Sequence, residues 1–344
     1  MEKVLTPHTH GRRPTLEDVA RRSGVSRSTV SRVINDEPRV SAEVVEQVRR
    51  VIAELGYVPN QAARQLVTRR TGAVAVVASQ PQNRLFLDPF FDCLLRGVRR
   101  ELAEHGAQAV LLFLDEPDDH TRVADYLGGG HVDGAVLFSL RPGDRLHEMA
   151  DRLDIPVVFG GRPLPRDGDT VRPHAYVDGD NRGGARQAVQ HLVSLGRTRI
   201  ATVTGPHDQE DSAAERLAGY RDVLPDAPPE LTERADYTEQ GGADAMAALL
   251  DRDPGLDAVF VASDLMAAGA LRTLRERGRR VPEDVAVIGF DDLTEISEAT
   301  DPRLTTVHQD VERMGRLMAR LLFDRPAQPP SVVVPTRLVV RASA

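Results

Sequence analysis

Hydrophobic positions along the chain follow two different spacings, and the change falls close to residue 70. Up to residue 55 they recur every three or four residues, in three groups: Leu16, Val19 and Ala20; Val30, Val33 and Ile34; Val44, Val48, Ile52 and Leu55. This spacing predicts three short amphipathic helices. Beyond residue 71, short runs of apolar residues alternate with helical patterns.

Capping residues mark the boundaries of the three predicted helices. Thr15, with an acid three positions later, has the pattern of a capping box, and Ser26 and Ser41 are suited to cap the next two helices. Gly24 and Gly56 stand where the first and third helices should end. Two short helices joined across a glycine turn and followed by a third packing helix describe a helix-turn-helix.

The remainder of the chain predicts repeated strand–helix units. Strands are expected at 73–78, 109–114, 135–139, 156–159, 200–204, 258–262 and 285–289, and an amphipathic helix at 89–105. Such units form parallel sheets covered by helices on both faces. The length of this segment suits two doubly wound subdomains, whose ligand lies beyond the carboxyl ends of the strands.

The composition is that of a soluble globular protein, since 41% of the 344 residues are hydrophobic, 28% are charged and the mean hydropathy is −0.32. No apolar run approaches the roughly 18 residues of a membrane span, and residues 1–14 lack the apolar core of a secretory signal. We therefore expect a cytoplasmic protein without a membrane partner. The single cysteine, Cys93, excludes an internal disulfide and a multi-cysteine zinc site. Without a cofactor loop, catalytic elbow or metal motif, no cofactor, metal or enzymatic activity is expected.

Charge is distributed unevenly between the two segments. Residues 1–70 carry 13 basic and 8 acidic side chains, whereas the rest carries 31 basic and 44 acidic ones. A basic first segment on an acidic body suggests that the first segment meets a polyanion. The second helix presents arginines and hydroxyls outward, which suit guanine edges and phosphates. A small helical bundle with a polar face would show the same periodicity.

The first segment resembles a known family. Residues 14–35, PTLEDVARRSGVSRSTVSRVIN, together with Val40-Ser41 and GYVPN at 56–60, closely resemble the DNA-binding head of LacI-family transcriptional regulators. The resemblance implies a helix-turn-helix domain at 1–58, in which Arg27, Ser28 and Arg32 read bases. It also implies phosphate contacts for five further residues, Thr15, Ser26, Thr29, Ser31 and Asn35.

Residues 59–70 match the hinge helix and linker of the same family. In the family this segment folds on operator DNA, pairs with its dimer mate and enters the minor groove. By position, Leu66 matches the leucine that wedges between base steps, Ala63 matches the small residue that allows close approach, and Asn60 is a further DNA contact. A plain linker with a chance leucine is the alternative.

The body, residues 71–344, is similar to the type I periplasmic-binding-protein-like effector and dimerisation domain of these regulators. The similarity rests on DPFF at 88–91, DGDN at 178–181, ERLAGY at 215–220, ASD at 262–264 and GFDD at 289–292. It implies three crossings between two doubly wound parallel-sheet subdomains. The expected N-subdomain covers about 71–172 and 307–330, and the C-subdomain about 173–306 and 331–344.

Candidate ligand residues lie where the predicted strands end. Ser263, Asp264 and Asp291 follow strands, and Arg216 opens a helix after another. Carboxylates and a guanidinium that converge on a cleft satisfy vicinal hydroxyls, which suits a carbohydrate. The family position adds an aromatic that stacks on the sugar, Tyr237. Phe90 and Phe91 are candidates for the opposite wall, with core packing as the alternative.

The body departs from the family at two positions. Residues 159–162, FGGR, lack the acid that many members have before the arginine, while Arg162 itself remains a candidate ligand contact. At the second position, Ser263 stands where many members have asparagine. Both changes leave room for a ligand larger than a monosaccharide. FGGR and LFLDPFF at 85–91 resemble the corresponding segments of actinobacterial repressors that respond to cello-oligosaccharides.

The resulting prediction is a homodimeric transcriptional repressor that binds pseudo-palindromic double-stranded operator DNA. A small sugar effector, cellobiose or another cello-oligosaccharide, is expected to lower its operator affinity. A different sugar, a nucleoside, or a ligand that acts as corepressor remains an alternative. A solute-binding protein would have no use for residues 15–66, and an enzyme would need a nucleophile, a cofactor loop or a metal cluster.

Overall fold

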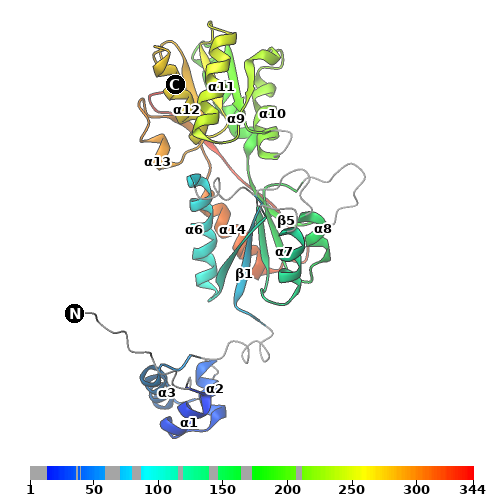
Figure 1. Cartoon of the computed structure of the whole chain (residues 1–344), viewed down its shortest axis with the longest axis vertical. Coiled ribbons are helices and arrows are strands. Elements are labelled where there is room, and N and C mark those ends of the chain that lie inside the picture. The colour runs from blue at the N-terminus through cyan, green and yellow to red at the C-terminus, as the bar shows by residue number, and fades with distance from the viewer. Residues whose placement is uncertain are drawn as a thin grey trace, which may run out of the picture. The chain divides into compact units, whose positions relative to one another are not determined.

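The computed structural model describes residues 14–35, 38, 40–58, 70–79, 87–114, 119–138, 146–163, 173–206 and 211–344. The chain divides into two compact units, Met1–Thr71 and Gly72–Ala344, whose elements are labelled in Figure 1. We call the first unit the head and the second the effector unit. Within the described residues, no helix combines the length and the apolar surface needed to cross a bilayer.

The head contains the three predicted helices, α1 (Leu16–Ser23), α2 (Arg27–Ile34) and α3 (Ala42–Leu55). Their apolar stripes meet in one core, in which Val19, Val30 and Val48 are fully buried. Tyr57, just after α3, packs against the same core. The short turn between α1 and α2 makes the pair a helix-turn-helix, as the spacing predicted.

Capping explains where α1 and α2 begin. The Asp18 amide donates to the Thr15 hydroxyl while the Thr15 amide donates to the Asp18 carboxylate, so the predicted capping box is confirmed. Ser26 caps α2 by accepting a hydrogen bond from the amide of Thr29, the third residue of the helix. Gly24 ends α1 with a φ of +67°, a conformation that disfavours a side chain. Ser41 stands at the start of α3, but its side chain makes no capping bond.

The first lobe of the effector unit is a six-stranded parallel sheet between two pairs of helices. The strand order is β11 (Ser331–Val334), β5 (Ala175–Gly179), β4 (Val157–Gly160), β3 (Ala135–Phe138), β1 (Ala73–Ala78) and β2 (Gln108–Phe113). Helices α6 (Pro89–Glu104) and α14 (Val311–Asp324) cover one face, and α7 (Asp119–Gly128) and α8 (Leu146–Arg152) the other (Figure 1). Because both faces are covered, alternate residues of β1 enter two different cores.

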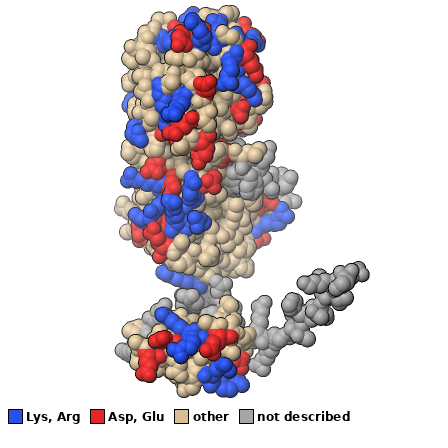
Figure 2. Space-filling view, turned by 90° about the vertical axis from the view of Figure 1, so that its left-hand side faces the viewer, with Lys and Arg blue, Asp and Glu red and all other residues tan. Residues whose placement is uncertain are grey.

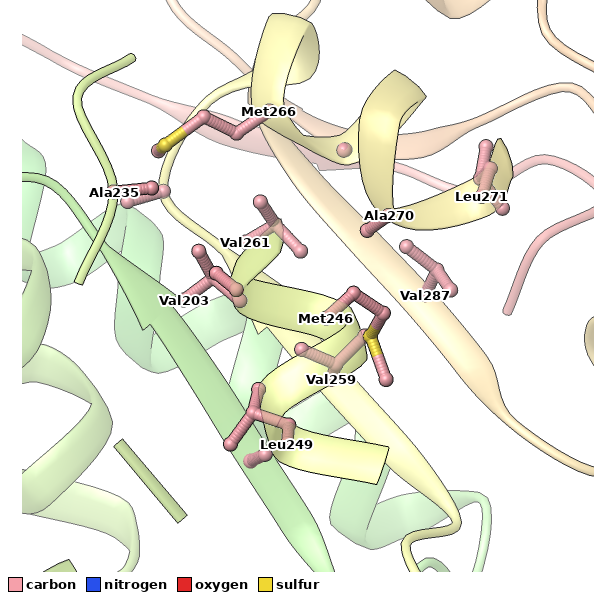
Figure 3. Packing of buried hydrophobic residues seen from close by; sticks show 14 of the residues in the cluster. Val203, Ala235, Met246, Leu249, Val259, Val261, Met266, Ala270, Leu271 and Val287 are labelled. Atoms are coloured by element: carbon pink, nitrogen blue, oxygen red, sulfur yellow. The ribbon is translucent and has the colours of Figure 1, made fainter. Parts of the chain in front are cut away.

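The second lobe repeats this architecture. Its strands lie in the order β12 (Arg337–Val339), β10 (Thr305–His308), β9 (Ala286–Asp291), β8 (Ala258–Val261), β6 (Ile200–Thr204) and β7 (Thr232–Arg234), with only β12 antiparallel to its neighbour. Helices α9 (Asn181–Ser194) and α10 (Asp211–Val223) pack on one face. Helices α11 (Glu239–Arg252) and α12 (Asp264–Glu276) pack on the other, where Figure 3 shows Met246 and Leu249 against Val259 and Val261.

The chain passes between the lobes later than the sequence predicted at two of the three crossings. Strand β5 pairs with β4, and β11 pairs with β5, so both belong to the first sheet. The predicted boundaries at 172 and 330 placed both strands in the C-subdomain, and that part of the prediction is wrong. The physical reason is the backbone ladder, which carries the first sheet through Gly179 and Val334 before the chain leaves it.

Helices α6 and α14 are joined by close packing and by charge. A Cβ added at Gly97 would overlap the carbonyl oxygen of Glu312, so only glycine allows this approach. The buried Glu101 carboxylate accepts hydrogen bonds from Arg316 and Arg320, and the hydrogen bond from Arg320 is the largest cause of its lowered pKa.

Figure 2 shows basic and acidic side chains interspersed over the surface that faces the viewer.

The second lobe has a comparable glycine contact between α11 and α12. A Cβ at Gly269 would overlap the carbonyl oxygen of Glu239. We expect Gly269→Ala to lower the free energy of unfolding of the effector unit by about 1–3 kcal/mol, because the two helix backbones must separate. Thermal unfolding followed by circular dichroism measures this loss. Gly128→Ala, whose new Cβ would have its nearest neighbour at 4.0 Å, is the matched control. Equal stability of the two variants would contradict this account of the contact.

Candidate functional site

The outward face of α2 carries the candidate base-reading residues. Val30 and Val33 are buried in the head, whereas Arg27, Ser28 and Arg32 are exposed. Ser28 and Arg32 lie one helical turn apart and therefore share a face. An α-helix fits the major groove of B-DNA, where a guanidinium can bond two acceptors of guanine at once. The head thus presents a helix of suitable size and chemistry for a base edge.

Hydroxyl groups gather at the amino ends of α1 and α2. The Ser26 hydroxyl lies 2.8 Å from the hydroxyls of both Ser28 and Thr29, next to the free amides of the first turn of α2. Such helix N-termini bind phosphate groups readily. Thr15 occupies the corresponding position on α1. The remaining predicted phosphate contacts, Ser31 and Asn35, lie partly exposed toward the end of α2.

One candidate base-reading arginine has a partner in the head itself. The Arg27 guanidinium donates to the Glu17 carboxylate at 2.8 Å, and both side chains are more than half exposed. An exposed ion pair of this kind contributes little to stability, so DNA could replace it at small cost. The three predicted hinge contacts, Asn60, Ala63 and Leu66, lie outside the described residues.

A cavity of about 910 Å³, part of it open to solvent, lies between the two lobes of the effector unit. Seven of the eight predicted ligand residues line it: Phe90, Phe91, Arg162, Arg216, Tyr237, Ser263 and Asp291. The first lobe contributes Phe90, Phe91 and Arg162, and the second lobe contributes the others. This mixture of apolar and polar groups is typical of a small-molecule site.

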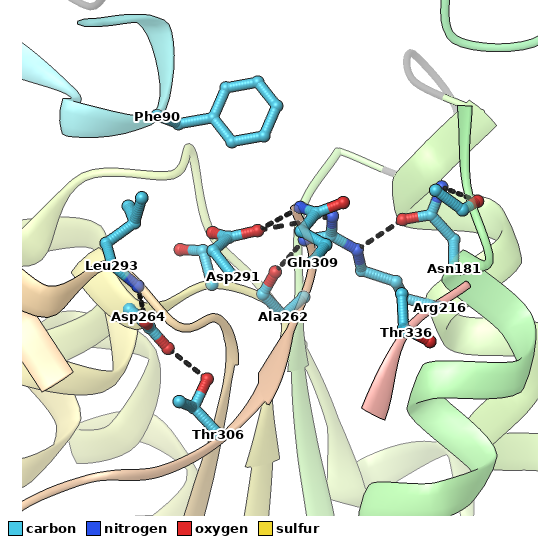
Figure 4. A network of polar contacts seen from close by, with 12 residues as sticks. Phe90, Asn181, Arg216, Ala262, Asp264, Asp291, Leu293, Thr306, Gln309 and Thr336 are labelled. Atoms are coloured by element: carbon cyan, nitrogen blue, oxygen red, sulfur yellow. Dashed lines mark hydrogen bonds and ion pairs between the residues drawn. The ribbon is translucent and has the colours of Figure 1, made fainter. Parts of the chain in front are cut away.

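A buried hydrogen-bonded network forms the polar centre of the cavity (Figure 4). The Arg216 guanidinium donates to the Asn181 side chain at 2.9 Å and lies 3.5 Å from the Asp291 carboxylate. Gln309 donates to the same Asp291 oxygen at 2.6 Å. The guanidinium also stacks 3.7 Å above the Phe290 ring, which fixes its plane. Helix α10 begins at Asp211, so Arg216 lies in its second turn instead of opening it as predicted.

The backbone at the end of β9 holds Asp291 in a strained conformation. Asp291 has a φ of 115° and Asp292 a φ of 57°, values that non-glycine residues rarely adopt. Such strain persists where neighbouring groups fix the backbone. The Asp292 carboxylate accepts hydrogen bonds from Arg341 at 2.7 Å and from Ser297 at 3.2 Å, and it lies 3.1 Å from a His308 ring nitrogen.

Asp264 does not line the cavity, so its predicted role as a ligand contact is not supported by the structure. Its side chain is fully buried below the cavity floor, where it accepts hydrogen bonds from the Leu293 amide and the Thr306 hydroxyl (Figure 4). Asp264 therefore supports the turn that follows Asp291. Its neighbour Ser263 lines the cavity and also caps α12.

The aromatic candidates differ in exposure. Phe90 is partly exposed and extends from α6 toward Asp291 (Figure 4), whereas Phe91 is 3% exposed and stacks on Phe138 in the core. Phe91 thus lines the cavity and also packs in the core, the two positions that the sequence left open. Tyr237 is buried in the second lobe, has a φ of 63° and lies so close to Gly205 that a Cβ there would overlap its ring.

The structure adds polar residues that the sequence analysis did not select. They also line the cavity: Asp88, Asp178, Asn181, Asp211, Ser212 and Gln309. Asp88, Asp178 and Asn181 belong to the strings DPFF and DGDN, so a signal for them existed in the sequence. Gln309 follows β10, a strand that was not predicted, and its position gave no signal.

Burial of the acid at the centre of the cavity has a consequence for stability. Burial, opposed by Arg216 and reinforced by Asp88, raises the pKa of Asp291 to about 7. An aspartate in the unfolded chain titrates near pH 3.9, so between these values the native state holds more protons and stability falls as pH rises. We expect the effector unit to lose on the order of 2 kcal/mol through this group between pH 5.5 and 8.

Urea unfolding at several pH values measures this effect. Asp291→Asn should flatten the pH dependence, whereas Asp226→Asn, a change on the exposed surface, should not. A slope in the Asp291→Asn variant identical to that of the wild type would refute the assignment.

Two family models match the chain. The model for bacterial regulatory proteins of the lacI family covers residues 15–60, and the model for a periplasmic binding protein-like domain covers residues 189–344. The HTH-type transcriptional regulator CelR of Thermobifida fusca is 50% identical over an alignment of 340 positions, which covers 96% of this chain and 98% of that protein. The ribose operon repressor of Escherichia coli K12 is 35% identical and covers 92% of this chain and 94% of its own length.

Solved structures agree with these matches. The complex of the transcriptional regulator CelR with cellobiose superimposes with a TM-score of 0.75 at 48% identity, covering 96% of this chain and all of that one. The Lac repressor dimer bound to operator and the anti-inducer ONPF gives a TM-score of 0.83 at 30% identity, with 96% and 99% coverage. The chain therefore belongs to the LacI family of bacterial transcriptional regulators.

Proposed function

We propose that this regulator is a homodimeric repressor that leaves its operator when cellobiose or another cello-oligosaccharide enters the effector unit. The observation that carries the proposal is the buried Arg216–Asp291 pair in a cavity between two lobes. The similarity to a regulator solved with cellobiose supports the choice of sugar, and the solved Lac repressor dimer supports the homodimer.

The cavity suits an uncharged sugar better than an ion. Arg216 offers donors and Asp291 offers acceptors, so neighbouring hydroxyls can bond to both. Phe90 and Tyr237 add aromatic surface for the apolar faces of the rings. Since the relatives are transcriptional regulators, we propose that the bound sugar is a signal in the cytoplasm and not a substrate.

The proposed mechanism depends on contacts from both lobes. A sugar held by Phe90 of the first lobe and Arg216 of the second favours one arrangement of the lobes over others. Its effect on operator affinity cannot exceed its difference in affinity between the two arrangements. We place the DNA contacts on α2, on its caps and on Thr15 at the start of α1, and we assign residues 59–70 to a hinge whose Asn60, Ala63 and Leu66 would reach the minor groove.

Thermal unfolding against a panel of ligands tests the proposal. The panel contains cellobiose, cellotriose, glucose, maltose, ribose and purines. A ligand present at 100 times its dissociation constant adds about 2.7 kcal/mol to the native state. That stabilisation should raise the melting temperature of the effector unit by roughly 5–11 °C.

The pattern of shifts separates the alternatives. A shift that is largest with cellobiose or cellotriose would support the proposal, and a shift with ribose instead would favour the alternative sugar suggested by the ribose operon repressors. Fluorescence anisotropy on labelled operator then distinguishes release from corepression. If the sugar tightened operator binding, it would act as a corepressor and not as an inducer.

A further inference from the structure

A second group of charged residues lines the same cavity as the Arg216–Asp291 pair. Arg162 follows β4, Asp178 is near the end of β5, and Asp211 is the first residue of α10. Both guanidinium groups, Arg216 and Arg162, oppose the rise that burial causes in the pKa of Asp178. Asp178 also accepts a hydrogen bond from Asn181, the side chain that accepts from Arg216, so the two groups adjoin along the cavity wall.

One carboxylate oxygen of Asp211, Oδ2, is buried without a hydrogen-bond donor from the described residues. Two acids face it, Asp178 on β5 and Glu215 on α10, and Arg162 is the only opposing charge that acts on it in the described chain. Burial and these acids raise its pKa to about 6. A buried oxygen without a donor is costly, so a ligand hydroxyl that donates to it would be favourable.

Glycines leave room for a ligand at this end of the cavity. Gly160 and Gly161 line the cavity immediately before Arg162. A Cβ at Gly161 would have no heavy atom of the described residues within 4 Å, so these residues leave the space beside the backbone open. A Cβ at Gly160 would instead overlap Met318, which shows that this backbone lies close against the core. The open space therefore adjoins Arg162 and not the core.

We propose that Arg162 and Asp211 form a second sugar subsite, which binds the second ring of a disaccharide. Asp211 accepts a hydroxyl of that ring, and the Arg162 guanidinium donates to another. Arg216 and Asp291 hold the first ring, so the second subsite selects a disaccharide over a monosaccharide. This inference rests on the proposed function, which supplies a sugar as the effector.

Isothermal titration of the full chain with cellobiose and with glucose tests the subsite. We expect Asp211→Ala to raise the Kd for cellobiose at least tenfold and the Kd for glucose less than twofold. Asp211→Asn, which keeps an acceptor, should stay within about threefold of the wild type. Asp222→Ala, near the exposed end of the same helix, is the matched control and should change neither constant. The melting temperature of each variant confirms that it is folded.

The pH dependence of binding gives a second readout, which a merely structural role of Asp211 would not produce. A donating hydroxyl stabilises the ionised carboxylate, so sugar binding should release protons near pH 6 and strengthen as pH rises through this value. Titration in two buffers with different heats of ionisation measures the protons. Because Asp291 titrates in a neighbouring range, the quantity to compare is the difference between wild type and Asp211→Asn.

The outcomes separate this inference from the function on which it rests. If the wild-type protein did not bind cellobiose, both the assignment of cellobiose as effector and the second subsite would be refuted. A wild type that binds cellobiose while Asp211→Ala weakens both sugars equally, or neither, would refute the subsite alone. Identical proton release in wild type and Asp211→Asn would also refute it.

Discussion

Replacing Arg216 with alanine is expected to give a repressor that binds its operator but no longer leaves it when sugar is added. Arg216 is 5% exposed, and its guanidinium joins Asn181, Asp291 and the Ala262 carbonyl across the cavity floor. Its loss removes charge-assisted hydrogen bonds to the ligand and leaves Asp291 without its positive neighbour. We expect the sugar Kd to rise at least about 100-fold, or roughly 2.7 kcal/mol.

Titration with cellobiose and operator anisotropy with added sugar measure the two properties separately. Arg221→Ala, an exposed arginine on the same helix, is the matched control and should behave as the wild type. Arg216→Lys keeps the charge but not the planar fork, so it should restore only part of the affinity. Normal sugar-dependent release by Arg216→Ala would remove this residue from the site.

Replacing both Arg27 and Arg32 with alanine is expected to produce the opposite phenotype. Both side chains are exposed on α2, and each arginine that bonds a guanine edge supplies about 1–3 kcal/mol of discrimination. We expect at least a 100-fold loss of affinity for the specific operator. The sugar-dependent rise in melting temperature should be unchanged, because the effector unit has its own core.

Operator and scrambled DNA of equal length distinguish base reading from general attraction. Arg50→Ala, an exposed arginine on α3, removes a charge from the head without touching α2. It should weaken binding to both DNAs alike and modestly. If the double variant also weakened both DNAs equally, these arginines would contact phosphates and not bases.

Much of the fold was predictable because local chemistry determines it. The three head helices follow from apolar spacing and from caps such as Thr15 and Ser26, which depend on neighbouring residues only. The central strands of both sheets are buried on both faces and therefore consist of continuous apolar runs. Strands β5 and β11 were missed because their place depends on partners far away in the sequence.

For the site, the sequence predicted only those charged and polar residues that follow the end of a predicted strand. Arg216 and Asp291 were found in this way, and both line the cavity. Asp264 has the same sequence signal, but its carboxylate accepts hydrogen bonds from the Leu293 amide and the Thr306 hydroxyl below the floor, partners about 30 and 40 residues later in the chain. Asp211 gave no signal, since its proposed role depends on a first-lobe arginine about 50 residues earlier in the chain.

The separation of the hydrophobic cores has an evolutionary consequence. The core of the head uses residues of α1 to α3 and Tyr57, whereas the cores of the lobes use residues beyond Gly72. A mutation that changes which operator the head recognises therefore does not disturb the packing around the effector cavity. Likewise, a mutation in the cavity does not disturb the packing of the head. Selection can redirect this regulator to new genes, or to new nutrients, one property at a time. Exchange of the head between paralogues would accomplish the first change in a single recombination.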